Sequence, residues 1–362
     1  MQITEIDAVH FDDFANHEKV MRCFDKSSGL LAYIAIHNST LGPALGGCRI
    51  WPYATEDDAI TDVLRLSRGM TYKSALANLA LGGGKAVIIA DPKTMKTEAL
   101  MKAMGVFVES LKGQYITAED SGTGVDDLKI MATETLHIAG IQNKKLKDGS
   151  ELSGDPSPMT AYGVFIGIKA SMLYKFGSAN LSDVRVAVQG VGNVGRNLSK
   201  MLVDAGAKVM VSDNYCPALE RITDEIDVTV IGNEKIHKQE VEVYSPCALG
   251  GALNMNSLVD LKAPIVAGAA NNQLSNQGAG DYLFHKGTIY APDYVINAGG
   301  IIDIFYEREG YDRTKVLNHI EGIGDTLSDI FQMAEKQKAS TQLMADKLAE
   351  CKFLKLPQDA VA

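Results

Sequence analysis

Runs of apolar residues alternate with stretches of helically spaced apolar residues along the first third of the chain. The run 30–38 is rich in residues that favour extended backbone, and it predicts a strand. Apolar positions keep helical spacing over 59–69, and Thr55 precedes them as a candidate N-cap, so we expect a helix there. The run 86–90 predicts another strand, and 97–112 predicts a second amphipathic helix.

Glycines and prolines interrupt this pattern at two places. They are so frequent in 41–53 that no regular element is expected there. Three consecutive glycines precede Lys85, which predicts a glycine-rich turn before the strand 86–90. A short strand over 115–119 then delivers Asp120 to a loop of Gly, Ser and Thr residues.

The second half of the chain has the pattern of a doubly wound parallel sheet. Arg185–Gln189 predicts a strand, Asn193–Ala205 predicts a helix, and a further apolar run ends in Asp213. A preceding helix is expected to begin with Thr160 as its cap and to run to Lys175. Further short apolar runs suit the same sheet and are found at 227–231, 241–244 and 264–269, and helices are expected from about 315 to 350.

Gly190, Gly192 and Gly195 stand in G-x-G-x-x-G spacing between the first of these strands and its helix. Glycines so placed permit a tight turn and the close approach of a pyrophosphate, which lies at the helix N-terminus. Asp213 lies where an acid bonds the ribose 2′-hydroxyl, and no Arg or Lys follows it directly, so NAD is favoured over NADP. The motif alone is weak, and coincidence stays open as the alternative.

Two asparagines follow predicted strands of this half. Asn271 comes after the run 264–269, and Asn297 comes after a run read as another strand and before two glycines. Ligands of open α/β sheets lie beyond the carboxyl ends of the strands, so Asn271 is a candidate ligand contact. A turn amide is the alternative for this residue.

The polar, turn-rich stretch 143–158 separates the two halves. The fold class is therefore α/β with two domains, 1–150 and 151–334, the second of Rossmann type, with a cleft between them. The helices over 335–362 are candidates to pack back on the first domain. We expect the active site in the cleft, with closure expelling water.

Composition narrows the function further. The chain has 362 residues, a net charge of −10 and a pI of about 5.2, and no long basic block, which argues against nucleic acid and anionic membrane as partners. No apolar run is long enough to span a bilayer. The five scattered cysteines show no metal-type pairing, so we expect reduced thiols, no metal and a cytoplasmic location.

Lys73, Lys85 and Asp120 are the candidate chemical groups of the first half. A lysine between an apolar strand and a glycine-rich turn tends to be partly buried, which lowers its pKa and suits it to acid–base chemistry. The alternatives are two ordinary surface lysines and an aspartate that serves as a helix cap or turn residue.

Ordered stretches over nearly the whole chain resemble the family of glutamate, leucine, valine and phenylalanine dehydrogenases, most closely its leucine dehydrogenases. The stretches are LGPALGGCR, LRLSRGMTYKSALANLALGGGKAVI, YITAED, SPMTAYGV, VAVQGVGNVG, AGAANNQ and APDYVINAGG. The resemblance implies a first domain for substrate binding and oligomerisation, an NAD cofactor, and a homo-oligomer of two to eight subunits.

The resemblance also implies roles for single residues. Lys85 matches the catalytic lysine, and Asp120 matches the acid that moves protons at the substrate nitrogen. Lys73 matches the lysine that binds the substrate carboxylate. The other implied substrate contacts are Leu45, Gly46, Gly47, Met70, Ala118, Asn271, Ile301 and Ile304. The implied cofactor contacts are Thr160, Gly190, Gly192, Asn193, Val194, Gly195, Asp213, Ala248, Asn271 and Asn297.

The implied reaction is the reversible oxidative deamination of an L-amino acid to a 2-oxo acid and ammonia, and Leu45 bears on its substrate. Glutamate dehydrogenases carry a lysine at this position, and burying an unpaired carboxylate beside Leu45 would cost several kcal/mol. Ile301 and Ile304 replace smaller valines, so leucine, valine and isoleucine are expected over phenylalanine. Ser121 stands where leucine dehydrogenases usually have valine, and Asp303 stands where they usually have asparagine. These differences bear on the expected specificity and not on the reaction class.

Three other readings stay open at this point. One is an aromatic L-amino-acid dehydrogenase, for phenylalanine or tryptophan, on the same scaffold. Another is an NAD-binding sensor without catalysis, against which the presence of Lys73, Lys85 and Asp120 together speaks. A hydroxy-acid dehydrogenase would need a catalytic histidine, and none of the seven histidines has a comparable glycine-rich setting.

Overall fold

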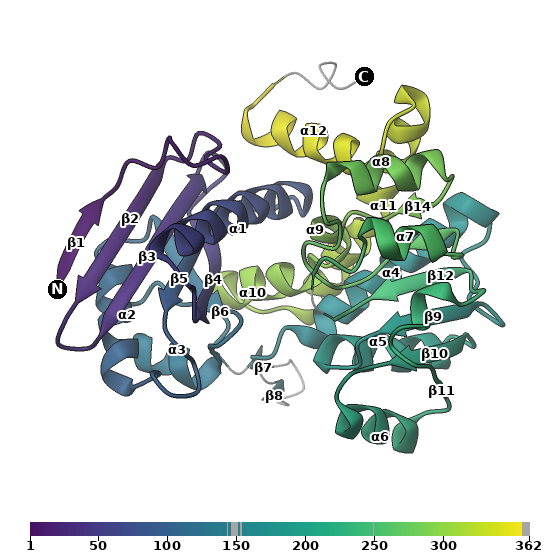
Figure 1. Ribbon diagram of the computed structural model, residues 1–362, viewed down its shortest axis with the longest axis horizontal. Helices are drawn as coiled ribbons and strands as arrows, with labels where there is room; N and C mark the ends of the chain where they lie inside the picture. The colour runs from purple at the N-terminus through teal and green to yellow at the C-terminus, as the bar shows by residue number, and fades with distance from the viewer. Residues whose placement is uncertain (143, 146–150, 153, 249, 357–362) are drawn as a thin grey trace. The chain divides into compact units, whose positions relative to one another are not determined.

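The computed structural model describes residues 1–142, 144–145, 151–152, 154–248 and 250–356. The described chain forms two compact units (Figure 1). Unit 1 comprises Met1–Gly154, Ile304–Tyr311 and Lys352–Leu356, and unit 2 comprises Asp155–Asp303 and Asp312–Cys351. Each unit is α/β, in agreement with the predicted fold class.

Unit 1 is built on a six-stranded mixed sheet with the order β1-β2-β3-β5-β4-β6. The first four strands of this order pair antiparallel, and β4 pairs parallel with both β5 and β6. The strands are β1 (Gln2–Glu5), β2 (Lys19–Asp25), β3 (Leu30–Asn38), β4 (Ala44–Trp51), β5 (Gly82–Ile89) and β6 (Tyr115–Glu119). The helices are α1 (Glu56–Leu76), α2 (Glu98–Glu109) and α3 (Val125–Met131), and a small hairpin joins β7 (Lys144–Lys145) to β8 (Glu151–Leu152).

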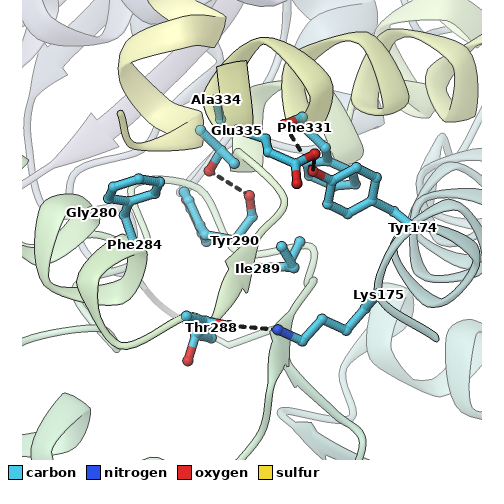
Figure 2. A pocket seen from close by; sticks show the side chains of 12 residues that line it. Tyr174, Lys175, Gly280, Phe284, Thr288, Ile289, Tyr290, Phe331, Ala334 and Glu335 are labelled. Atoms are coloured by element: carbon cyan, nitrogen blue, oxygen red, sulfur yellow. Dashed lines mark hydrogen bonds between the residues drawn. The ribbon is translucent and has the colours of Figure 1, made fainter. Parts of the chain in front are cut away.

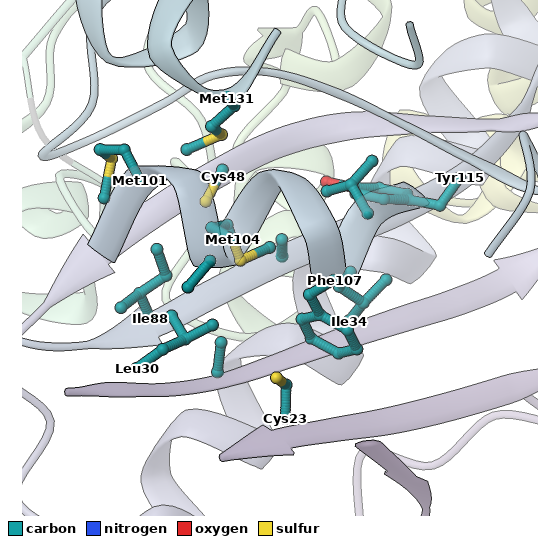
Figure 3. Packing of buried hydrophobic residues seen from close by; sticks show 14 of the residues in the cluster. Cys23, Leu30, Ile34, Cys48, Ile88, Met101, Met104, Phe107, Tyr115 and Met131 are labelled. Carbon is teal, nitrogen blue, oxygen red and sulfur yellow. The ribbon is translucent and has the colours of Figure 1, made fainter. Parts of the chain in front are cut away.

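Helices cover both faces of this sheet (Figure 1). The α1 face buries Tyr33 and Val87 against Val63 and Leu64. The opposite face buries Ile34 and other strand residues against α2 and α3, and Figure 3 shows Met104, Phe107 and Met131 on that side. With apolar residues on both faces, strands such as β3 lack a polar–apolar alternation, which is why they read as continuous apolar runs.

The predicted strand 30–38 and the cap at Thr55 are confirmed. The Thr55 hydroxyl accepts from the Asp58 backbone N–H at 3.1 Å, and the Asp58 carboxylate accepts from the Thr55 N–H at 3.1 Å. The helix does not stop at Gly69 but continues to Leu76, which carries Lys73 on its last turn. A Cβ at Gly69 would meet nothing within 4 Å, so no neighbouring segment packs against this glycine closely enough to interrupt the helix.

Two expectations from the glycine content of unit 1 are wrong. Residues 41–53 contain the strand β4, and the three glycines before Lys85 are the start of β5 rather than a turn. A Cβ at Gly83 would lie 2.0 Å from the backbone nitrogen of Thr71 in α1. These glycines therefore let a strand pass close to its neighbours, which local turn rules read as a break.

Two later segments of the chain complete unit 1. The Glu307 carboxylate accepts the backbone N–H groups of Gly140, Ile141 and Gln142 at 3.0, 3.1 and 3.2 Å. The ring of Phe353 packs against Tyr72 and His37, with ring centroids 5.3 and 5.9 Å away. The first segment, Ile304–Tyr311, falls in the predicted second domain 151–334, whereas Phe353 falls in 335–362, the stretch expected to pack back on the first domain.

Unit 2 is built on a fully parallel six-stranded sheet with the order β11-β10-β9-β12-β13-β14. The strands are β9 (Arg185–Gln189), β10 (Lys208–Ser212), β11 (Thr229–Val230), β12 (Val243–Pro246), β13 (Ile265–Val266) and β14 (Ile289–Tyr290). The helices up to β14 are α4 (Ser157–Phe176), α5 (Asn193–Asp204), α6 (Cys216–Glu225), η1 (Ile236–Lys238), α7 (Met255–Asp260) and α8 (Gln277–His285). The later helices are α9 (Asp293–Ile296), α10 (Gly299–Glu309), α11 (Arg313–Gln337) and α12 (Thr341–Phe353), and α10 and α12 end in unit 1.

The parallel sheet and the β9-α5-β10 order confirm the Rossmann-type prediction, with two local corrections. Thr160 does not cap α4 but lies in its first turn, where its hydroxyl donates to the Pro156 carbonyl at 3.1 Å. Asn297 follows the short helix α9, whose N-cap is Pro292, rather than a strand.

All five cysteines are free thiols, and Cys23, Cys48 and Cys351 are buried. Among the described residues, no helix combines the length and the apolar character that a membrane crossing needs.

Candidate active site

The parallel strands β4, β5 and β6 bring three charged residues of unit 1 together. The strand register sets Cys48 of β4 opposite Ala86 of β5 and Glu119 of β6. Lys85 precedes Ala86, Asp120 follows Glu119, and Arg49 follows Cys48. These side chains therefore meet at one level of the sheet although they are far apart in the sequence.

Lys85 and Asp120 form a buried ion pair between Nζ and Oδ2. Lys85 is only 6% exposed, so the pair is largely shielded from water. Burial opposes ionisation of Asp120, but the charges of Lys85 and Arg49 outweigh it and hold the pKa of this carboxyl well below its usual range. The structure thus pairs the two residues that the sequence singled out for proton transfer.

Arg49 is a second cation at Asp120 and was missed at the sequence level. Its Nε lies 3.3 Å from Asp120 Oδ2, and its Nη1 lies 2.9 Å from Asp62 Oδ2 in α1. The Tyr53 hydroxyl donates to the same Asp62 oxygen at 2.5 Å. The only sequence feature that could have indicated a role for Arg49 is its position directly after Gly-Gly-Cys in β4. The strand register is needed to identify the residues that it contacts.

The predicted glycine and alanine contacts surround this pair. A Cβ at Gly46 would lie 1.8 Å from the Gly84 carbonyl oxygen, and one at Gly47 would lie 2.7 Å from the Asp120 Cβ. Ala118 is buried in β6, two residues before Asp120. Small residues at these positions let β4 and β6 approach Lys85 and Asp120 closely.

The other predicted substrate residues of unit 1 lie on separate elements. Lys73 and Met70 are half-buried on α1. Leu45 is buried in β4 and lines a cavity of about 180 Å³ with Pro43, Ala80, Leu81, Phe305, Arg308 and Glu309. Ile304 is buried in unit 1, and Ile301 and Asp303 are buried in unit 2.

The glycine motif of unit 2 has the geometry that a dinucleotide requires. Gly190 has a φ of +96°, and a Cβ at Gly195 would lie 1.9 Å from the Gly190 carbonyl oxygen. A Cβ at Gly192 would meet nothing within 4 Å, so the space beside the N-terminus of α5 is open. Asn193 and Val194 start this helix, and no side chain caps it. The first and third glycines serve the turn and the packing, and the second leaves room for a phosphate.

Asp213 and Ala248 lie beside this loop. The Asp213 carboxylate accepts the Val191 backbone N–H at 2.8 Å and the Tyr215 N–H at 2.9 Å. A Cβ at Gly190 would lie 2.8 Å from the Ala248 Cβ. These residues follow β9, β10 and β12, where the strand order reverses, and ligands of open α/β sheets bind at such a point.

Asn271 and Asn297 are brought together in unit 2. Asn297 Nδ2 donates to Asn271 Oδ1 at 2.8 Å and to the Ala269 carbonyl at 3.0 Å. Asn297 Oδ1 is buried without a hydrogen-bond partner, and such an acceptor fits a ligand donor. Thr160 lies beside Gly300, because a Cβ at Gly300 would be 2.5 Å from the Thr160 hydroxyl oxygen.

A separate cavity of about 270 Å³ in unit 2 contains none of the predicted site residues (Figure 2). Its polar groups bond each other, since Lys175 donates to the Gly287 carbonyl at 2.8 Å and Tyr174 donates to Glu335 at 2.8 Å.

Comparison with known proteins restricts the open readings to the amino-acid dehydrogenases. Residues 17–137 match the dimerisation domain of Glu/Leu/Phe/Val dehydrogenases, and residues 153–217 and 216–351 match the Glutamate/Leucine/Phenylalanine/Valine dehydrogenase domain. The chain belongs to the Glu/Leu/Phe/Val dehydrogenase family. It is thus an amino-acid dehydrogenase, and the family implies a nicotinamide dinucleotide cofactor, for which the unit 2 loop is suited.

Three members of the Glu/Leu/Phe/Val dehydrogenase family illustrate the similarity. Leucine dehydrogenase of Bacillus cereus is 47% identical over 92% of this chain and 90% of its own length. Valine dehydrogenase of Streptomyces virginiae is 44% identical over 93% of this chain and 94% of its own length. The crystal structure of L-tryptophan dehydrogenase from Nostoc punctiforme matches with a TM-score of 0.80 and 43% identity, over 94% of this chain and 97% of that one.

Proposed function

We propose that this chain catalyses the reversible, NAD-dependent oxidative deamination of branched-chain aliphatic L-amino acids to 2-oxo acids and ammonia. The observation that carries the proposal is the buried Lys85–Asp120 ion pair beside Arg49. A base and an acid in contact, largely shielded from water, suit a reaction that moves several protons.

Lys73, Asp120 and Lys85 have distinct tasks in this reaction. Lys73 binds the substrate carboxylate, and Asp120 takes a proton from the substrate amine. The bound nicotinamide supplies the hydride acceptor for the Cα hydrogen. Lys85 in its neutral form activates the water that attacks the resulting imine, and in its charged form it stabilises the oxygen anion. Asp120 then returns a proton to the nitrogen that leaves as ammonia.

Leu45 supports an aliphatic rather than an acidic substrate. Its buried side chain contributes no charge, and an unpaired substrate carboxylate beside it would cost several kcal/mol. Ile301 and Ile304 are also buried and apolar, as a pocket for leucine, valine and isoleucine requires.

Asp213 supports NAD as the cofactor. Its carboxylate is held at the glycine loop by two backbone N–H groups, where it can accept a hydrogen bond from a ribose hydroxyl. A 2′-phosphate at this place would be repelled by the same charge.

A second candidate is an aromatic amino-acid dehydrogenase. The L-tryptophan dehydrogenase of Nostoc punctiforme is 46% identical over 335 residues, almost the same identity as the leucine dehydrogenases. One methylene changes substrate preference by only about 10- to 200-fold, so a few pocket residues separate the two candidates.

The description of residues 17–137 as a dimerisation domain supports a homo-oligomer, and the free buried thiols support a cytoplasmic location. The direct test is NADH formation at alkaline pH with each common L-amino acid and with NAD or NADP. Turnover of leucine, valine and isoleucine with NAD is expected. Turnover of aromatic substrates alone would favour the second candidate, and no turnover at all would contradict both.

A further inference from the structure

Both cations at Asp120 contact the same carboxylate oxygen. Lys85 Nζ pairs with Oδ2, and Arg49 Nε lies 3.3 Å from that same Oδ2. The Asp120 side chain is 18% exposed, so part of it remains in contact with solvent. Two contacts from two strands, β5 and β4, fix the rotation of a carboxylate more tightly than one ion pair can.

We infer that Arg49 is a positioning residue that turns Oδ2 of Asp120 inward, and that Oδ1 is the oxygen that exchanges a proton with the substrate amine. The inference rests on the proposed function, because it assigns the geometry of the same site. Arg49 itself needs no contact with the substrate in this role.

Contacts with a second carboxylate fix the position of Arg49. Its Nη1 lies 2.9 Å from Asp62 Oδ2, and Tyr53 donates to that oxygen at 2.5 Å. Only the planar fork of a guanidinium can reach Asp120 with one nitrogen and Asp62 with another. A lysine at position 49 would keep the charge but would lose one of these two contacts.

Arg49 also affects the ionisation of Asp120. Together with Lys85 it holds the pKa of this carboxyl well below its usual range. Loss of the Arg49 contact would raise that pKa, so the ionised Asp120 that accepts the amine proton would form only at a higher pH. Cys48 of β4 and Tyr115 of β6 also interact with Asp120, and burial raises the pKa of both.

Unit 1 offers a matched control in a second arginine that pairs with a carboxylate of α1. Arg22 Nε lies 2.9 Å from Glu56 Oε2 in α1, and the Tyr33 hydroxyl bonds the same carboxylate oxygen. This cluster repeats the arginine–carboxylate–tyrosine chemistry of Arg49, with a similar exposure of 29% against 23% for the arginine. Arg22 lies on β2, which β3 and β5 separate from β4.

The test compares Arg49→Lys, Asp62→Asn and Tyr53→Phe with Arg22→Lys in leucine deamination. For Arg49→Lys we expect kcat to fall on the order of 10- to 100-fold, with little change in leucine KM and with the acidic limb of the pH profile at higher pH. Asp62→Asn should act in the same direction and Tyr53→Phe least, and Arg22→Lys should leave kcat and the pH profile unchanged. A ¹³C NMR titration of labelled aspartate should show the Asp120 pKa rising in Arg49→Lys and not in Arg22→Lys.

Three results would overturn the inference. One is an unchanged pH profile and Asp120 titration in Arg49→Lys, which leaves only a structural role. Another is a loss of kcat in Arg22→Lys equal to that in Arg49→Lys. The third is a rise in leucine KM at constant kcat, which indicates that Arg49 binds the substrate. Wild-type protein without turnover would instead contradict the proposed function, and the NMR titration would still report whether Arg49 holds Asp120.

Discussion

Lys85 lies on the same face of the unit 1 sheet as α1, because alternate residues of a strand point to opposite faces. Val87 packs in the cluster on the α1 face, whereas Ala86 and Ile88 pack in the cluster on the other face. Lys85 has the parity of Val87, and Asp120, two residues beyond Ala118, joins it from β6. The candidate acid and base are thus placed by strand parity rather than by a mobile loop.

Replacement of Lys85 by Ala should abolish turnover and spare dinucleotide binding. The substitution removes the group proposed to activate water, and such groups contribute about 10²- to 10⁴-fold to the rate. The residues suited to the dinucleotide all lie in unit 2, so NADH affinity should stay unchanged. Steady-state deamination and NADH fluorescence measure the two effects. Lys102→Ala, at a half-exposed lysine paired with Glu98, is the control, and near-normal turnover of Lys85→Ala would refute the assignment.

Replacement of Asp213 by Ser should weaken the preference for NAD. The serine cannot repel a 2′-phosphate, and it makes a weaker hydrogen bond to the ribose, so NAD KM should rise about tenfold while NADP KM falls. Initial rates with both cofactors test this expectation. Asp260→Ser changes a carboxylate on α7 that pairs with Lys238 and should alter neither constant. An unchanged ratio of the two KM values in Asp213→Ser would remove this residue from the cofactor site.

At the scale of the element, glycine content was the point at which sequence patterns failed. Gly82, Gly83 and Gly84 have no side chain to signal a strand, and their local reading is a turn. Their true constraint is tertiary, because the backbones of β3 and α1 and the ring of Tyr115 approach them more closely than a side chain allows. Where apolar side chains carried the signal, as over 30–38 and 185–189, the predicted strands agree with the structure.

The same distinction separates the candidate site residues that the sequence indicated from those that it did not. Lys85 and Asp120 stand in recognisable motifs, so their roles could be inferred by resemblance. Arg49 meets Asp120 only because β4 pairs with β6 in one register, and it meets Asp62 because α1 crosses the same face. No local pattern encodes that register, so this part of the site required the three-dimensional structure.

Gly83→Ala and Gly69→Ala should have opposite effects on stability. A Cβ at Gly83 would lie 2.0 Å from the Thr71 backbone nitrogen, so β5 and α1 would have to separate, at a cost of about 3 kcal/mol or more. A Cβ at Gly69 meets nothing within 4 Å in the middle of α1, where alanine stabilises a helix by about 1 kcal/mol. Urea unfolding of both variants tests the pair. A stable Gly83→Ala protein would show that the strand and helix are not closely packed.

At the scale of the whole molecule, a ring cluster joins distant parts of unit 1. His17 and His37 stack edge to face with ring centroids 4.9 Å apart, and Phe353 packs on His37. His37 Nδ1 bonds the Thr71 hydroxyl at 2.8 Å, which ties the cluster to α1. Burial lowers the pKa of His17 to about 4, and burial together with the neighbouring His17 and Arg68 lowers the pKa of His37 to about 3.

Unit 1 should therefore lose stability on acidification. Both histidines take up a proton more readily when unfolded, near pH 6.5, so their contribution is complete above that pH and is lost as pH falls toward 4. The slope approaches about 1.4 kcal/mol per pH unit for each histidine. Urea unfolding followed by Trp51, the single tryptophan, reports on unit 1. His37→Gln should reduce the dependence of the unfolding free energy on pH, whereas replacement of the exposed His285 by Gln should not. A stability that does not change with pH would contradict the lowered pKa values of His17 and His37.

The return of Lys352–Leu356 to unit 1 has a consequence during synthesis on the ribosome. Unit 1 begins with the first residues to emerge, but Phe353 follows the whole of Asp155–Asp303 and Asp312–Cys351. Until it emerges, the rings of His37 and Tyr72 lack their contacts with Phe353. The first unit to be synthesised therefore cannot complete its ring packing until nearly all of the second unit has been translated.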